Sequence, residues 1–254
     1  MTGVPTHKSS SAGPKIIFLH GYCEAGWIWQ EIISGLQNTF TCLAPDLPGF
    51  GSNVQLPEEK TIESVAEVVW RELDQNQISD AVLIGHSLGG YVALAMAESR
   101  PRAIRGLGLI HSTPFADTPE KKVNRDKVVA FVQNHGSRLF LDQFASGLFY
   151  EKNAEQIKSF RKKIDSTSLE SIIHYAVAMR DRPDRSAVIR EMKVPVLTVC
   201  GRYDTILPFE ICDQISALNN AVESHVLESS AHAGMLEERN QTIQIIKEFT
   251  EKCL

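Results

Sequence analysis

Three residues of this chain, Ser87, Asp204 and His232, have the types and the order needed for nucleophilic attack on a carbonyl group. A serine hydroxyl is a weak nucleophile at neutral pH, so an imidazole must accept its proton and a carboxylate must orient the imidazole and stabilise its charged form. Ser87 lies at the centre of the glycine-x-serine-x-glycine pattern in residues 85–89. The sequence therefore predicts an acyl-transfer site with Ser87 as nucleophile, His232 as base and Asp204 as the orienting acid.

The residues around Ser87 favour this interpretation over a chance match of glycine and serine. Residues 81–84 form a short apolar run typical of a buried strand, and residues 88–97 are rich in small residues and leucine, as in a closely packed helix. Ser87 is thus predicted to occupy a strand-to-helix turn. The flanking glycines let the backbone fold sharply there and direct the serine side chain outward.

An oxyanion hole is predicted from the first strong strand, residues 15–19, which ends at His20 and Gly21. A glycine at this point lets the following N–H groups turn into the space above the sheet, where they can stabilise a developing oxyanion. We expect the N–H groups of Tyr22 and Leu88 to form the hole. His20 is expected to order the turn rather than to take part in catalysis.

A second loop, residues 46–52, begins with Asp46 and contains one proline and two glycines. Asp46 could bind a metal ion or a sugar hydroxyl. We expect it to brace the loop instead, because no second residue of metal-ligand type lies beside it.

Asp204 and His232 each follow an apolar strand, residues 195–201 and 225–227. The carboxyl ends of parallel strands meet at one edge of a sheet, so both side chains are expected near Ser87. Alternatives stay open, because Asp204 could simply cap a turn and other histidines could serve as the base. These competitors are His86, His111 and His174. His232 is favoured because it alone lies in a short glycine-containing loop after the last strand.

The chain is predicted to form one α/β core with an insertion. Strands and helices alternate up to residue 113, which indicates a parallel sheet covered by helices on both faces. Residues 114–192 have helical spacing of apolar residues and few strand-like runs, so we interpret them as a helical cap inserted between core segments 15–113 and 193–254. Residues 1–14 are small and polar and are expected to form a flexible tail.

Phe140, Phe144 and Leu148 recur at intervals of four on one face of a helix expected in this insertion. Packing within the cap is the simpler explanation of this spacing. Part of the same face could also bind substrate, and such a pocket would favour apolar acyl or alcohol groups.

The amino-acid composition limits the classes of molecule that this protein is expected to bind. The 254 residues are 43% hydrophobic and 22% charged with a net charge of -5, which gives no electrostatic reason to expect nucleic acid or an anionic membrane. No apolar run approaches the roughly 18 residues needed to cross a bilayer. Five cysteines occur without C-x-x-C spacing, which suggests reduced thiols in a soluble, cytoplasmic protein. They are Cys23, Cys42, Cys200, Cys212 and Cys253.

The motifs at residues 18–21, 46–51, 85–90, 201–204 and 231–232 together resemble those of the α/β-hydrolase superfamily, in particular its serine esterase-like branch with a helical cap. The resemblance extends from Lys15 to the carboxy terminus. It implies an eight-stranded, mostly parallel sheet, a helical lid after the sixth strand, a Ser-His-Asp triad, and neither cofactor nor metal. It does not imply a substrate.

Departures from other branches of this superfamily are informative. Haloalkane dehalogenases and epoxide hydrolases carry aspartate where this chain has Ser87. Carbon-carbon-bond hydrolases usually have a glycine-proline-glycine segment after the first His-Gly, and here the segment is residues 22–26. The menaquinone-pathway lyase usually has an arginine where this chain has Tyr91.

We therefore expect a serine hydrolase that cleaves a small carboxylic ester through an acyl-enzyme. A thioesterase, a lactonase, an acyl-transferase or a perhydrolase could use the same three residues, and a ligand-binding receptor of this fold is a weaker alternative. The substrate and the oligomeric state are left open by the sequence.

Overall fold

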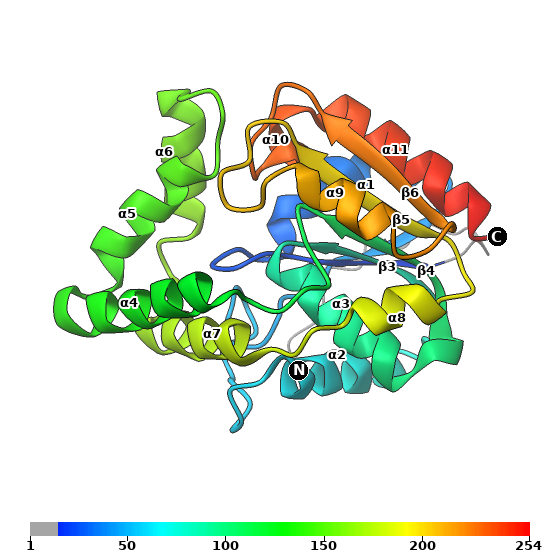
Figure 1. Ribbon diagram of the computed structural model, residues 1–254. Helices are drawn as coiled ribbons and strands as arrows, with labels where there is room; N and C mark the ends of the chain where they lie inside the picture. The colour runs from blue at the N-terminus through cyan, green and yellow to red at the C-terminus, as the bar shows by residue number, and fades with distance from the viewer. Residues whose placement is uncertain (1–14) are drawn as a thin grey trace.

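Six parallel strands form the centre of the protein in the computed structural model, which describes residues 15–254 (Figure 1). Their order across the sheet is β2-β1-β3-β4-β5-β6. The strands are β1 (Lys15–Leu19), β2 (Thr41–Leu43), β3 (Ala81–His86), β4 (Ile104–Ile110), β5 (Val196–Gly201) and β6 (Val222–Leu227). Strands β1, β3 and β5 are buried almost throughout, as expected for a sheet covered on both faces.

The expectation of eight strands is wrong for the described part of the chain, which has six. The number eight came from the resemblance alone. Six apolar runs of the sequence coincide with these strands, although β6 begins three residues earlier than its run. The runs are residues 15–19, 41–45, 81–84, 104–110, 195–201 and 225–227. The helical insertion accordingly follows β4, the fourth strand, and not a sixth. The tail expected at residues 1–14 lies outside the described residues.

Helices cover both faces of the sheet. Helices α1 (Gln30–Leu36) and α11 (Arg239–Lys252) pack together on one face, and α2 (Ile62–Gln75) and α3 (Leu88–Ser99) pack together on the other (Figure 1). Helix α2 begins after Thr61, whose side chain accepts a hydrogen bond from the N–H of Ser64 at 3.1 Å. Threonine is among the residue types preferred at this position of a helix.

Helix α3 can lie close to the sheet because its first turn contains Gly89. A Cβ atom at Gly89 would lie 2.2 Å from the carbonyl oxygen of Leu19 in β1. A Cβ at Gly85 would lie 2.4 Å from the Gly89 backbone. Both glycines are therefore required for the helix to start directly against β1 and β3, which fixes where Ser87 stands.

The segment between β4 and β5 is helical, and its first four helices lie beyond the carboxyl ends of the strands (Figure 1). It contains α4 (Pro119–His135), α5 (Ser137–Gly147), α6 (Ala154–Lys163), α7 (Leu169–Asp181) and α8 (Ser186–Glu191). Helix α4 begins at Pro119, because Thr118 caps it and Pro119 occupies its first turn. The buried Arg182 holds the end of this segment through the carbonyl oxygens of Met179 and Phe115 at 2.6 and 2.9 Å.

Two of the five cysteines form a disulfide, which corrects the expectation that all are thiols. Cys200 on β5 is bonded to Cys212 on α9 (Glu210–Ser216), and their Cα atoms are 6.3 Å apart. Cys23, Cys42 and Cys253 are free. Within residues 15–254 no helix combines the length and the apolar character needed to span a membrane.

Candidate active site

Ser87 occupies the sharp turn between β3 and α3 that its glycine pattern predicts. Its backbone has φ 50° and ψ -114°, a conformation that residues other than glycine rarely adopt. Two hydrogen bonds hold it: the Ser87 N–H donates to the carbonyl of Ile110 at 2.9 Å, and the Ser112 hydroxyl donates to the Ser87 carbonyl at 2.7 Å. The end of β4 thus maintains the strained turn.

Three of the four described residues other than glycine that have positive φ angles follow neighbouring strands, and the fourth, Gln77, follows α2. Cys23, Ser87 and His111 have positive φ angles of 61°, 50° and 48°, and they follow β1, β3 and β4 respectively. Such conformations persist only where the surrounding structure imposes them, and they tend to occur at functional sites. A functional site is therefore expected at this edge of the sheet.

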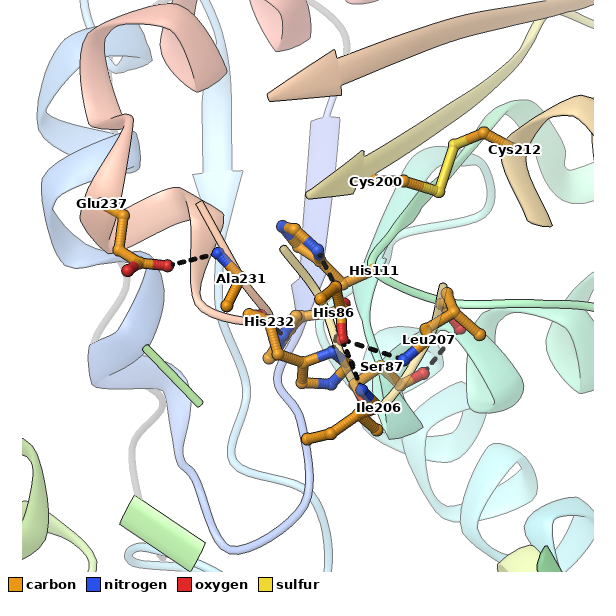
Figure 2. Close-up of polar contacts among 12 residues, drawn as sticks. His86, Ser87, His111, Cys200, Ile206, Leu207, Cys212, Ala231, His232 and Glu237 are labelled. Atoms are coloured by element: carbon orange, nitrogen blue, oxygen red, sulfur yellow. Dashed lines mark hydrogen bonds and ion pairs between the residues drawn. A yellow bond between two sulfur atoms is a disulfide. The ribbon is translucent and has the colours of Figure 1, made fainter. Parts of the chain in front are cut away.

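Asp204 and His232 are joined at this edge. His232 Nδ1 lies 2.7 Å from Asp204 Oδ2, and Asp204 Oδ1 accepts hydrogen bonds from the N–H groups of Ile206 and Leu207, both at 2.9 Å (Figure 2). Asp204 thus caps its own turn and also contacts the imidazole. Because Nδ1 donates to the carboxylate, Nε2 of a neutral His232 is left as a proton acceptor.

The carboxyl group of Asp204 stays ionised. Burial alone would raise its pKa, but attraction to His232 and hydrogen bonds from His111 and His232 outweigh burial and hold the pKa of Asp204 far below its usual range. A permanent carboxylate is what an imidazole needs when it takes up a proton during a reaction.

His111 is a second histidine on the same carboxylate, and sequence reasoning had considered it only as a competing base. Its Nδ1 lies 3.2 Å from Asp204 Oδ2, while its Nε2 is buried and has no hydrogen-bond partner within residues 15–254. Burial lowers the pKa of His111 to about 4, so the ring is neutral and donates from Nδ1. His111 directly follows β4, at the same sheet edge as Asp204, and this position in the sequence could have predicted its contact with Asp204.

Nitrogen and oxygen atoms of His111, Asp204 and His232 lie within 4.8 Å of one another, a spacing that could also suit a metal ion. Both rings, however, are already hydrogen-bonded to Asp204 Oδ2, so an ion would have to replace these two bonds. The geometry fits a hydrogen-bonded set better than a metal site.

His86, the residue before Ser87, forms a buried ion pair with Glu24. His86 Nδ1 lies 2.9 Å from Glu24 Oε2, and His86 Nε2 lies 2.9 Å from the carbonyl oxygen of His232. A carboxylate and a carbonyl can only accept, so both ring nitrogens donate and His86 is an imidazolium. Burial lowers the pKa of His86, but the charge and hydrogen bond of Glu24 outweigh it and the pKa is raised.

Neither His86 nor His174 has the contacts expected of the base. His86 has no free nitrogen to accept a proton. His174 lies on α7, and no hydrogen bond joins it to a carboxylate within the described residues. His20 accepts a hydrogen bond from the Leu47 N–H at 2.8 Å and bonds the Gly21 carbonyl at 2.8 Å, so it orders its loop as expected.

The two expected oxyanion donors are available. Within residues 15–254, neither the Tyr22 N–H nor the Leu88 N–H donates a hydrogen bond to another protein group. The Tyr22 side chain is held separately, because its hydroxyl donates to the carbonyl of Ile172 at 2.7 Å. Asp46 braces its loop as expected, accepting hydrogen bonds from Gly26 and Ser52.

The residues expected at the substrate-binding face lie against the loops of Tyr22 and His232. The rings of Phe140 and Phe144 are 6.0 and 5.7 Å from the Tyr22 ring. Leu148 is only 1% exposed, and its carbonyl oxygen accepts hydrogen bonds from the N–H groups of His232 and Ala233 at 3.0 and 3.1 Å. The Leu148 side chain is thus buried, while its backbone contacts the loop of the histidine.

A parallel α/β sheet that carries a strained serine turn and an Asp–His pair at one edge defines a hydrolase of the α/β class. The comparison with known families agrees, because the model of the alpha/beta hydrolase fold matches residues 14–239. The chain belongs to this family and is an enzyme of the hydrolase class.

Individual relatives are similar over nearly the whole chain. The pimeloyl-[acyl-carrier protein] methyl ester esterases of Methylococcus capsulatus and Wigglesworthia glossinidia brevipalpis are 27% and 28% identical to it, and each comparison covers 95% of this chain and 96% or 95% of the relative. Among solved structures, a thermophilic esterase from Thermogutta terrifontis superimposes with a TM-score of 0.89 at 25% identity, covering 98% of this chain and 97% of the other.

Proposed function

We propose that the protein is a serine esterase that hydrolyses a carboxylic ester through an acyl-enzyme. The observation that carries this proposal is the 2.7 Å hydrogen bond between His232 Nδ1 and Asp204, at the sheet edge that also carries the strained turn of Ser87. It leaves His232 Nε2 free to accept a proton beside a serine held at a strand end.

In the first half of the reaction, the Ser87 hydroxyl oxygen bonds to the ester carbonyl carbon while His232 Nε2 takes its proton. The carbonyl oxygen becomes negative and accepts hydrogen bonds from the N–H groups of Tyr22 and Leu88. The tetrahedral intermediate then expels the alcohol, which receives the proton from His232. Asp204 stabilises the charged ring throughout.

In the second half, a water molecule gives a proton to His232 and adds to the acyl carbon. The new intermediate expels the Ser87 oxygen, which recovers the proton, and the carboxylic acid leaves. A thioester, a lactone, or an acceptor such as an alcohol or hydrogen peroxide would use the same acyl-enzyme. Ester hydrolysis is favoured because the relatives named above are esterases.

The helical segment 114–192 is proposed to act as a cap that selects the substrate. Phe140 and Phe144 present apolar rings to Tyr22, beside the proposed oxyanion hole. An apolar acyl or alcohol group would gain affinity from these rings. We therefore propose a small ester with an apolar portion as substrate.

Labelling and turnover test the proposal together. Short-chain aryl esters should be hydrolysed, and a fluorophosphonate should form one adduct, on Ser87. Ser87→Ala should lower kcat by about 10⁴-fold or more, because the residues of such a site act as a unit. Wild-type protein that neither turns over an ester nor forms the adduct would refute the proposal.

A second candidate is an ester attached to an acyl carrier protein, as the names of two relatives state for those proteins. Helix α6 favours it, because Lys158, Lys162 and Lys163 are exposed there and form a positive surface suited to an acidic protein. The test compares kcat/KM for one methyl ester, free and carrier-bound. A preference for the carrier-bound ester that weakens with salt supports this candidate, whereas equal values exclude it.

A further inference from the structure

Helix α5 and the turn that follows it contact both halves of the proposed catalytic machinery. The rings of Phe140 and Phe144 pack on Tyr22, which is proposed to supply an oxyanion donor. The carbonyl of Leu148, immediately after the helix, accepts hydrogen bonds from the N–H groups of His232 and Ala233. A single element outside the sheet thus touches the loop of the oxyanion hole and the loop of the base.

One carboxylate joins this turn to the loop of the base. Glu237 Oε1 accepts a hydrogen bond from the Tyr150 N–H at 2.7 Å, and Glu237 Oε2 accepts one from the Ala231 N–H at 2.9 Å. Figure 2 shows the second bond, next to His232. Since each oxygen is committed to a different segment, Glu237 fixes the distance between the turn and the residue that precedes His232.

An aromatic contact also joins the turn at residues 148–150 to the loop of Asp204. The rings of Tyr150 and Tyr203 stack at a centroid separation of 3.7 Å and an interplanar angle of 6°. Tyr203 immediately precedes Asp204. The turn at residues 148–150 is therefore bonded to the loop of His232 and stacked on the loop of Asp204.

We propose that Glu237 is a positioning residue for the base: it locks the turn at residues 148–150 onto the His232 loop and thereby couples the substrate-facing helix α5 to the orientation of His232. This inference rests on the proposed function. A general base must lie within hydrogen-bond reach of the proton it removes, and a misplacement of about 1 Å can lower the rate by about 100-fold. The Leu148 carbonyl bonds the His232 backbone directly, so movement of the turn is transmitted to the base.

Glu238 provides a matched control. It is the adjacent glutamate, and its Oε2 accepts a hydrogen bond from the Ser229 N–H at 2.8 Å, in the same loop as His232. Within the described residues it makes no hydrogen bond to the turn at residues 148–150. Glu238→Ala therefore removes a loop contact without breaking the connection to α5.

The kinetic test compares Glu237→Ala, Glu237→Gln and Glu238→Ala with wild-type protein on a short-chain aryl ester. Glu237→Ala is expected to lower kcat and the rate of fluorophosphonate labelling at Ser87 by about 10-fold to 100-fold, with KM changed less than threefold. Glu237→Gln, which keeps one accepting oxygen, should fall between Glu237→Ala and wild type. Glu238→Ala should stay within twofold of wild type.

Hydrogen exchange supplies a readout that does not depend on turnover. In Glu237→Ala, backbone amides in both 148–152 and 230–234 should exchange faster, whereas Glu238→Ala should affect only the region of Ser229. Equal kinetics and equal exchange in the two alanine variants would overturn the positioning role. Wild-type protein that neither hydrolyses an ester nor labels at Ser87 would instead refute the proposed function, so the two failures are distinguishable.

Discussion

His86 Nε2 donates a hydrogen bond of 2.9 Å to the backbone carbonyl of His232, so the residue preceding the proposed nucleophile is bonded to the proposed base. The other ring nitrogen of His86 is paired with Glu24, which also accepts the Gly21 N–H at 2.7 Å. One buried imidazolium therefore connects the loop of the oxyanion hole, the serine turn and the base loop. Its charge state should influence both stability and activity.

Glu24→Gln should destabilise the protein by about 1–3 kcal/mol, because the neutral amide can still accept hydrogen bonds from His86 and Gly21 but cannot balance the buried charge of His86. Urea unfolding measures the change. Glu31→Gln is the matched control, since Glu31 pairs with Arg239 on the surface, where both side chains are at least half exposed. That pair should contribute about 0–1 kcal/mol. Equal losses in the two variants would contradict a special role for the buried pair.

The same ion pair predicts a pH dependence of stability. The pKa of His86 is raised above its ordinary 6.5 in the folded protein, so above pH 6.5 the folded state binds more protons than the unfolded chain. The stabilisation is fully present below pH 6.5 and is lost as pH rises through the raised pKa. Urea midpoints measured from pH 6 upward should fall more steeply for wild type than for Glu24→Gln. Parallel curves would show that His86 is not held charged.

His111 predicts that stability also falls at acidic pH, below pH 6.5. Its pKa is lowered to about 4 by burial, so between pH 6.5 and pH 4 the unfolded chain binds a proton that the folded protein does not. Stability should be lost as pH falls through this window, by at most about 3 kcal/mol. His111→Phe should flatten this part of the curve. An unchanged slope in the variant would indicate that His111 is not buried in its neutral form.

Asp204→Asn should lower kcat by about 10⁴-fold while the protein stays folded, because an amide neither stabilises a charged imidazole nor selects its useful tautomer. Initial rates on an aryl ester and thermal unfolding together test this. Asp80→Asn is the control, because Asp80 pairs with Arg105 on the surface. Activity of Asp204→Asn near that of the control would remove Asp204 from the mechanism.

Phe144→Ala should change the preference among ester substrates more than the rate of the chemical step. Loss of the ring that faces Tyr22 should lower kcat/KM for esters with longer apolar acyl groups by about 10-fold, or about 1.4 kcal/mol, and affect acetate esters less. Leu139→Ala is the control on the same helix, because Leu139 is 51% exposed. A panel of aryl esters of increasing acyl length gives the measurement. A uniform loss across the panel would argue against a contact with the acyl group.

Chain-local patterns were sufficient to predict much of this architecture. Apolar runs predict the six strands, and the glycines around Ser87 predict the sharp turn, because both depend on residues that are neighbours in sequence. Asp204 and His232 could be placed because parallel strands carry their ends to one edge. The count of eight strands, taken from the resemblance and not from apolar runs, was wrong for the described residues.

Only the tertiary structure decided which side chains form ion pairs, hydrogen bonds and the disulfide. Glu24 and His86 are 62 residues apart in the chain, and His111 and Asp204 are 93 apart. The bond between Cys200 and Cys212 likewise depends on how α9 packs against β5. Spacing along the chain carries no signal for these pairs, because each forms where separate elements of the fold pack together. The sequence by itself thus determined the strands and the serine turn, and three-dimensional packing determined the contacts that hold His232 in place.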